Sequence, residues 1–245
     1  MSKDKFYNNL INRFMDIVTD NNLLEERIRV GGITLSPLEA IGNTEKEDFP
    51  IVKGKEKLIE VTFKGEKGQA FTDMPSNFTG TLKEIIEMPL ESNFNRAIYI
   101  ATLNAVCRYL KLTDNTIHCR DNGPEKCAVE LESYLESRFG NPKIALIGFQ
   151  PSMLDRLSKS FKVRVIDLDK NNINTVKYGV LVEDGEKDIK DLLTWCDVIV
   201  ATGSTIANST ITSLFVDDKP TIFFGTTLAG AAAIMGLERF CPCSK

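Results

Sequence analysis

The chain has 245 residues, of which 42% are hydrophobic and 26% charged, and its formal net charge is −4. This is the composition of an ordinary soluble globular protein, and the length favours two domains over one. The acidic balance excludes the basic character of nucleic-acid binders, and the longest apolar run, residues 223–236, is too short and too rich in glycine to span a membrane. We expect neither a nucleic-acid nor a membrane partner.

The N-terminal segment predicts a cytoplasmic protein. Residues 1–10 lack the apolar core of a secretion signal. In a reducing compartment, the six cysteines should be free thiols or metal ligands rather than disulfides. Symmetric dimers are the commonest oligomers of such chains, so a homodimer is the expected assembly.

The first part of the chain, residues 1–112, predicts a small α+β domain. Residues 4–22 repeat apolar side chains at helical spacing. Residues 27–35, 56–65 and 69–73 are short and rich in branched residues, which is typical of strands in an antiparallel meander. Residues 92–112 predict a helix that is apolar nearly all round and therefore buried between layers.

A loop and a helix, residues 113–140, link this domain to the next. Pro124 suits the first position of a helix, with Gly123 as the cap before it. Gly140 is typical of the end of a helix.

The remaining residues predict a Rossmann-like α/β domain, which with the linking loop and helix spans residues 113–245. Its four nearly continuous apolar runs are "KIALIGF", "KVRVIDLD", "DVIVATG" and "PTIFFGT". Helical patterns over 151–160, 187–195 and 205–215 separate them. Strands that alternate with helices in this way form a parallel sheet covered on both faces.

Ligands of an open parallel sheet bind beyond the carboxyl ends of its strands. Residues 148–153 follow the first predicted strand and lack the G-x-G-x-x-G pattern, which argues against a classical dinucleotide site. Asp167 follows the second strand, where an acid can bind a ribose hydroxyl or simply begin a turn.

The third and fourth predicted strands are each followed by a glycine and two hydroxyls, residues 203–205 and 225–227. At the start of a helix, such groups donate hydrogen bonds to an anion. The hydroxyls can equally cap the helices, and for Thr205 both interpretations stay open.

Three segments carry a resemblance to a known family: "CDVIVATGSTIANSTITSLF", "SNFNRAIYIATLNAV" and "KIALIGFQPSMLDRL". They resemble a bacterial and archaeal family of unknown function described as "putative heavy-metal chelation". The resemblance implies a small domain similar to the enolase N-terminal domain, then a Rossmann-like domain, with a site in the cleft between them. The matching positions are Asn104, Phe149, Gln150, Gly203, Ser204, Thr205, Asn208, Gly225, Thr226 and Thr227.

Cysteines and the only histidine form a second candidate site. "IHCRDNGPEKCA" carries His118, Cys119 and Cys127, and "FCPCSK" carries Cys241 and Cys243. Cys127 falls in the first turn of a predicted helix, which should lower its pKa and favour the thiolate. Together these donors suffice for tetrahedral zinc or a cluster, with iron, nickel or copper as other soft transition metals.

The spacing of these residues differs from the usual pattern of structural zinc sites, and adjacent residues rarely bind one ion comfortably. Free thiols are therefore the alternative. Cys107 and Cys196 lie in apolar segments and are expected in the core.

No catalytic set can be assigned. A single histidine beside a cysteine forms no catalytic triad. Asp167 or Glu39 could act as a general acid or base, but nothing in the sequence distinguishes either from the other carboxylates. Two main hypotheses follow: a protein that binds a soft metal or metal complex, and a binder or enzyme for a small anionic, nucleotide-like or pterin-like ligand. An interaction scaffold with neither is the third.

Overall fold

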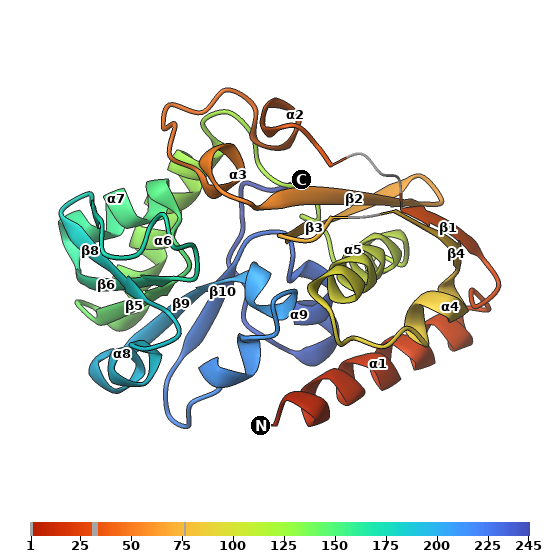
Figure 1. Ribbon diagram of the computed structural model, residues 1–245. Coiled ribbons are helices and arrows are strands. Elements are labelled where there is room, and N and C mark those ends of the chain that lie inside the picture. Colours follow the sequence, from red (N-terminus) through yellow and green to blue (C-terminus); the bar gives the residue numbers. More distant parts are fainter. Residues whose placement is uncertain (1, 31–33, 76) are drawn as a thin grey trace.

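The computed structural model describes residues 2–30, 34–75 and 77–245, which form a mixed α/β structure with an antiparallel and a mostly parallel sheet (Figure 1). Among these residues, no helix has the length and apolar character that crossing a membrane requires. The expected α/β fold class is confirmed.

The antiparallel sheet has the strand order β3-β2-β1-β4, with β1 at Arg27–Val30, β2 at Lys57–Phe63, β3 at Glu66–Thr72 and β4 at Phe78–Thr81. A tight turn at Lys64 and Gly65, both with positive φ, joins β2 to β3, as expected for a two-residue hairpin. The predicted meander is confirmed for β1, β2 and β3, whereas β4 was not predicted. Residues 31–33 of the first predicted strand lie outside the described residues.

Helices α4 (Leu82–Ile86) and α5 (Asn93–Tyr109) pack against this sheet, and α1 (Lys3–Asp20) packs against α4 and α9 (Ala229–Met235). The predicted helices at 4–22 and 92–112 are confirmed. α5 is buried along most of its length, and Gly68 of β3 permits its close approach, because a Cβ there would lie 2.3 Å from the Ala101 carbonyl oxygen. Cys107 on α5 is fully buried, as expected.

The second sheet has the order β10-β9-β5-β6-β8-β7. Its parallel strands are β5 (Lys143–Ile147), β6 (Lys162–Asp167), β8 (Val180–Asp184), β9 (Val198–Thr202) and β10 (Thr221–Phe224), and β7 (Val176–Lys177) is an antiparallel edge. The chain runs outward from β5 to one edge and then to the other, which is the Rossmann-like arrangement. The four predicted strands are confirmed, and β7 and β8 were not predicted.

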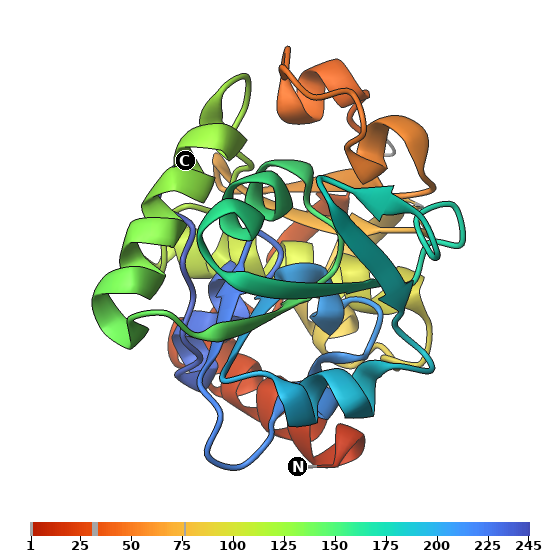
Figure 2. The same cartoon turned by 90° about the vertical axis from the view of Figure 1, so that its left-hand side faces the viewer.

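Helices cover both faces of the parallel sheet (Figure 2). Ile144 and Leu146 of β5 pack with α6 (Gly123–Phe139) and α7 (Pro151–Ser160). The alternate residues, Ala145 and Ile147, join the cluster that contains α8 (Ile189–Trp195) and α9 (Ala229–Met235). Cys196 is buried in that cluster, as expected.

Two local predictions were wrong. Residues 205–215 do not form an α-helix, because short 3-10 turns at Gly203–Ile206 and Ile211–Leu214 flank Ser209, whose φ is +62°. Gly123 is the first residue of α6 rather than its cap, which is Asn122. Pro124 is accordingly the second residue of the helix rather than the first, and Gly140 ends the helix as expected.

The larger hydrophobic cluster contains residues of α1, α5 and the parallel sheet, so it joins the two sheets. The division into domains 1–112 and 113–245 stays a prediction.

Candidate functional site

A cavity of about 890 Å³ lies at the carboxyl ends of the parallel strands. Its wall on this side includes Gly148 after β5, Asp167 at the end of β6, and Gly203 after β9. Phe71 and Thr72 of β3 line it from the antiparallel sheet. β6 and β9 leave β5 in opposite directions, so the cavity occupies the switch point where open α/β sheets bind ligands. Its volume suits a small organic molecule.

Asp167 lines the cavity and also holds the two loops beside it. Oδ2 accepts hydrogen bonds from the Phe149 N–H at 2.9 Å and the Asn172 amide at 3.3 Å, and Oδ1 accepts one from the Asp169 N–H at 2.8 Å. Burial raises the pKa of Asp167, and these hydrogen bonds oppose that effect. The carboxylate therefore positions the turn after β5, and its interpretation as a ribose ligand stays a prediction.

Gln150 has a comparable role at the start of α7. Its side-chain oxygen accepts the N–H of Met153 and caps the helix. Phe149 and Gln150 both line the cavity, as the resemblance implies.

The turn after β9 is held together mainly by its own hydrogen bonds. The Thr205 hydroxyl donates to the Thr202 carbonyl at 2.8 Å, and the Thr202 hydroxyl accepts the Ser204 N–H at 3.3 Å. Asn208 accepts hydrogen bonds from the N–H and hydroxyl of Thr210. Gly203, Ser204, Thr205 and Asn208 line the cavity, but the Thr205 hydroxyl is already used within the turn.

Asn104 supports the cavity from behind and does not line it. Its side chain is fully buried and donates to the carbonyls of Gln69, Thr226 and Thr227, and it accepts the Gly230 N–H at 2.7 Å. Thr226 is also buried and lies outside the lining, whereas Gly225 and Thr227 belong to it. Asn104 thus fixes the turn after β10 against β3.

The C-terminal segment reaches the histidine loop. The backbones of Ile117 and Lys245 exchange hydrogen bonds of 2.8 and 2.9 Å. As a result, four of the five proposed donors line one part of the cavity: His118, Cys119, Cys127 and Cys241. Cys243 lies outside the lining, with its sulfur 3.8 Å from a Glu130 carboxylate oxygen.

The Cys127 and Cys241 thiols line the same cavity, and each affects the ionisation of the other. The neighbouring Cys241 and burial raise the pKa of Cys127, contrary to the lowered pKa predicted from its place in α6. Cys127 and the charge of Arg239 lower the pKa of Cys241. These directions favour Cys241 as the more acidic thiol of the pair.

Burial shifts the pKa values of both Cys119 and His118. Burial raises the pKa of Cys119 to about 12 and lowers the pKa of His118. The His118 Nδ1 lies 2.6 Å from the Cys119 carbonyl oxygen, and the ring packs edge-on against Phe71. Nδ1–H donating to that carbonyl leaves Nε2 of the neutral ring as an acceptor.

Within the described residues, no three histidine, cysteine, aspartate or glutamate side chains are grouped as ligands of one metal ion. The chain brings the predicted donors to one region, but it does not form a closed tetrahedral site from them.

Sequence reasoning missed an acidic region of the cavity. Burial, together with the charges of Asp167, Asp73 and Asp169, raises the pKa of Glu56 to about 7. All four side chains line the cavity. They come from segments that are far apart in the chain, and no local pattern marks Glu56. The negative charges of this region oppose an anionic ligand group near it.

Comparisons with known proteins identify relatives of unknown function. Residues 133–233 match the family DUF364, "Putative heavy-metal chelation". A DUF364 protein of unknown function from Pyrococcus horikoshii shares the fold with a TM-score of 0.52 at 17% identity, over 89% of this chain and 79% of that chain. A second one, from Desulfitobacterium hafniense, has a TM-score of 0.49 at 14% identity, over 95% of this chain and 83% of that chain. No curated protein matches this chain.

Proposed function

Starting from the match of residues 133–233 to the family "Putative heavy-metal chelation", we propose that the cavity binds a soft heavy-metal ion. The observation that carries the proposal is that two thiols, Cys127 and Cys241, line the same cavity, and that the pKa of Cys241 is lowered there. Thiolates are the protein ligands that soft metals such as zinc and copper prefer. In this proposal Cys241 supplies the first ligand, and Cys127 supplies a second when it loses its proton.

The size of the cavity supports a metal that arrives as a complex with a small molecule. Two cysteines leave coordination positions open, and the described residues contain no group of three ligands that would close them. A volume of about 890 Å³ is far larger than a bare ion requires. An organic ligand would complete the coordination and fill the space beside the thiols.

The acidic region supports a cationic rather than an anionic occupant. Glu56, Asp73, Asp167 and Asp169 line the cavity together with only two lysines from the described residues, Lys55 and Lys170. An excess of negative charge attracts cations and repels anions. The negative charge attracts a metal ion or a cationic complex, whereas it would repel a phosphate near Glu56.

Cadmium binding to the full chain, purified without oxygen, tests the proposal. We expect about one tightly bound Cd²⁺ per chain, and a Cys127→Ser/Cys241→Ser variant to lose at least about tenfold in affinity. The matched control is Cys107→Ser/Cys196→Ser, which removes two buried thiols away from the cavity. Equal binding by both double variants, or no binding by the parent chain, would contradict the proposal.

A second candidate function is a binder or enzyme for a small organic ligand. The observation that favours it is the place of the cavity at the switch point between β5 and β9. Thermal unfolding with AMP and with folate, as nucleotide and pterin probes, separates the two functions. Stabilisation that persists in Cys127→Ser/Cys241→Ser would favour the organic ligand.

A further inference from the structure

The connection between β1 and β2 is much longer than the sheet requires. The two strands are antiparallel neighbours, which a two-residue turn can join. Instead, residues 31–56 separate them. Residues 36–56, which we call the flap, contain α2 (Pro37–Ile41) and α3 (Pro50–Lys53) and lie at the top of the molecule in Figure 1. The flap is therefore longer than the pairing of β1 with β2 requires.

The flap forms one wall of the cavity. Its lining residues are Ile41, Phe49, Pro50, Ile51, Lys55 and Glu56. The facing wall comes from the parallel sheet and from the loop of His118 and Cys119. Movement of the flap would open the cavity along this side.

The apolar side chains of the flap pack with one another and with the antiparallel sheet. Ala40, Ile41, Phe49 and Ile51 form a small cluster with Leu58 of β2, and Leu35 and Phe71 pack against it. None of these described residues belongs to the two larger clusters that hold the sheets together. Segments with few contacts to the main core open at lower free energy than the whole molecule unfolds.

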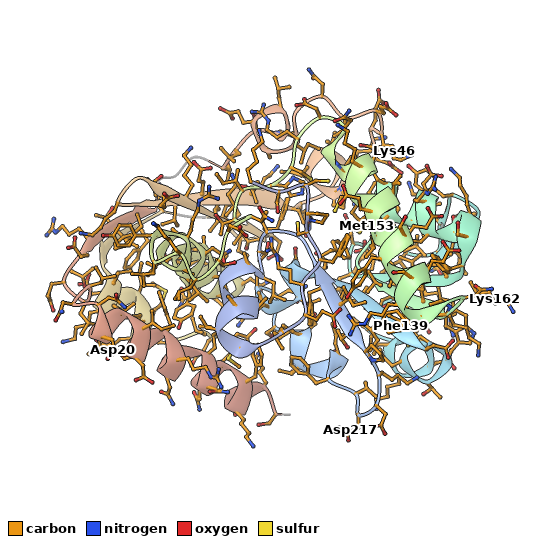
Figure 3. The ribbon with its side chains drawn as sticks, turned by 180° about the vertical axis from the view of Figure 1, so that it is seen from behind. Asp20, Lys46, Phe139, Met153, Lys162 and Asp217 are labelled. Atoms are coloured by element: carbon orange, nitrogen blue, oxygen red, sulfur yellow. The ribbon has the colours of Figure 1, made fainter. Side chains whose placement is uncertain are left out.

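Polar contacts fasten the flap to the parallel-sheet half. Lys46 forms an ion pair of 2.7 Å with Asp155 of α7, and its ammonium lies 4.8 Å from the centre of the Tyr178 ring. The Tyr178 hydroxyl donates to Asp48 of the flap at 2.9 Å. Lys46 lies above Met153 in the view from behind (Figure 3). Part-exposed contacts of this kind are weak individually and are screened by salt.

A backbone contact joins the flap to the loop that carries the thiols. The Asp121 N–H donates to the Ile41 carbonyl at 2.8 Å, and the Asp121 carboxylate accepts the Asn43 N–H at 3.0 Å. Gly42 between them has a φ of +68°, and a Cβ there would lie 2.3 Å from an Asp121 oxygen. The flap is thus seated directly beside the loop of Cys119.

We propose that residues 36–56 are a lid, and that release of Lys46 and Asp48 from Asp155 and Tyr178 admits the ligand to the cavity. Apolar packing within the flap lets it move as one body, while polar contacts set how often it opens. This inference concerns access to the cavity and does not depend on which ligand binds there.

The rate at which N-ethylmaleimide labels Cys119 and Cys127 measures lid opening without a known ligand. Both thiols line the cavity and are only 7% and 3% exposed. Trypsin cleavage after Arg120 and Lys126 separates them for mass spectrometry. We expect labelling to become up to about fivefold faster in Lys46→Met, the upper end of the range for the loss of one such ion pair. Tyr178→Phe should act in the same direction.

Asp155 provides a matched control, because Lys159 on its own helix also pairs with it, at 2.8 Å. Lys159→Met removes an ion pair of the same carboxylate without touching the flap and should leave labelling unchanged. Cys107 in the core reports global unfolding in the same sample. Equal labelling in Lys46→Met and Lys159→Met, or a parallel rise at Cys107, would overturn the proposal.

Discussion

At the scale of single residues, Glu56 is the most perturbed carboxyl group of the cavity. Its side chain has no neighbouring pattern that distinguishes it in the sequence, whereas the fold surrounds it with Asp167, Asp73 and Asp169. The elevated pKa follows first from burial and then from those charges. Folding therefore has an electrostatic cost that depends on pH.

We expect Glu56→Gln to stabilise the protein at pH 8 but not at pH 4.5. The folded pKa of about 7 exceeds the ordinary value of 4.5, so the unfolded chain loses this proton first and stability falls as pH rises between the two values. The gain at pH 8 should be roughly 1–2 kcal/mol. Urea unfolding at both pH values measures it, with the exposed Glu45→Gln change on the same flap as the control. A gain that is equal at both pH values would refute the electrostatic cause.

The thiols show what residue-level reasoning can and cannot predict. The sequence identified the residues that meet at the cavity, because cysteine and histidine are rare in this chain. It predicted the wrong pKa direction for Cys127. That prediction considered only the position at the start of a helix, and not burial or the neighbouring Cys241. This neighbour arrives through backbone pairing of Lys245 with Ile117, a contact between distant segments that no local pattern reveals.

At the scale of elements, the predictable parts are those with a strong apolar pattern. The buried strands β5, β6, β9 and β10 are nearly continuous apolar runs, α5 is apolar nearly all round, and α1 repeats apolar side chains at helical spacing. The missed strands β4, β7 and β8 are short or half-exposed, and pairing with a neighbour rather than composition makes them strands. The segment after β9 has a helical pattern, but close packing of Gly203 on Leu228 accompanies a 3-10 turn there.

Asn104 joins three elements, and its replacement tests that role. Asn104→Ala should destabilise the protein by about 2–4 kcal/mol, because several buried carbonyls and the Gly230 N–H lose their partner. Urea unfolding measures the loss. Asn9→Ala, which removes one exposed hydrogen bond to Arg13, is the control and should change stability by less than about 0.5 kcal/mol. Similar losses in both variants would mean that Asn104 does not hold the turn after β10 in place.

At the scale of the whole molecule, one hydrophobic cluster runs from α1 through α5 to the parallel sheet. The cavity is lined from both sheets, so its shape depends on how they are held together. A shared core makes the two halves energetically dependent, since separating them would expose apolar surface of both. The predicted division at residue 112 can thus be tested by cooperativity.

We expect urea to unfold the chain in a single transition. The only tryptophan, Trp195, lies on α8 and reports on the parallel-sheet half by fluorescence, while far-UV circular dichroism reports on both halves. The two signals should have coincident midpoints if the shared cluster unfolds as a unit. Two separate transitions would instead support domains 1–112 and 113–245 that are independently stable.

The pairing of Lys245 with Ile117 also decides where an affinity tag belongs. A polyhistidine tag added after Lys245 would begin beside Cys241 and bring imidazoles close to the cavity thiols. Such a tag would bind the cadmium that the titration is meant to count. The N-terminus lies on the opposite side of the molecule (Figure 1), so a tag placed there and then removed leaves the cavity thiols unchanged.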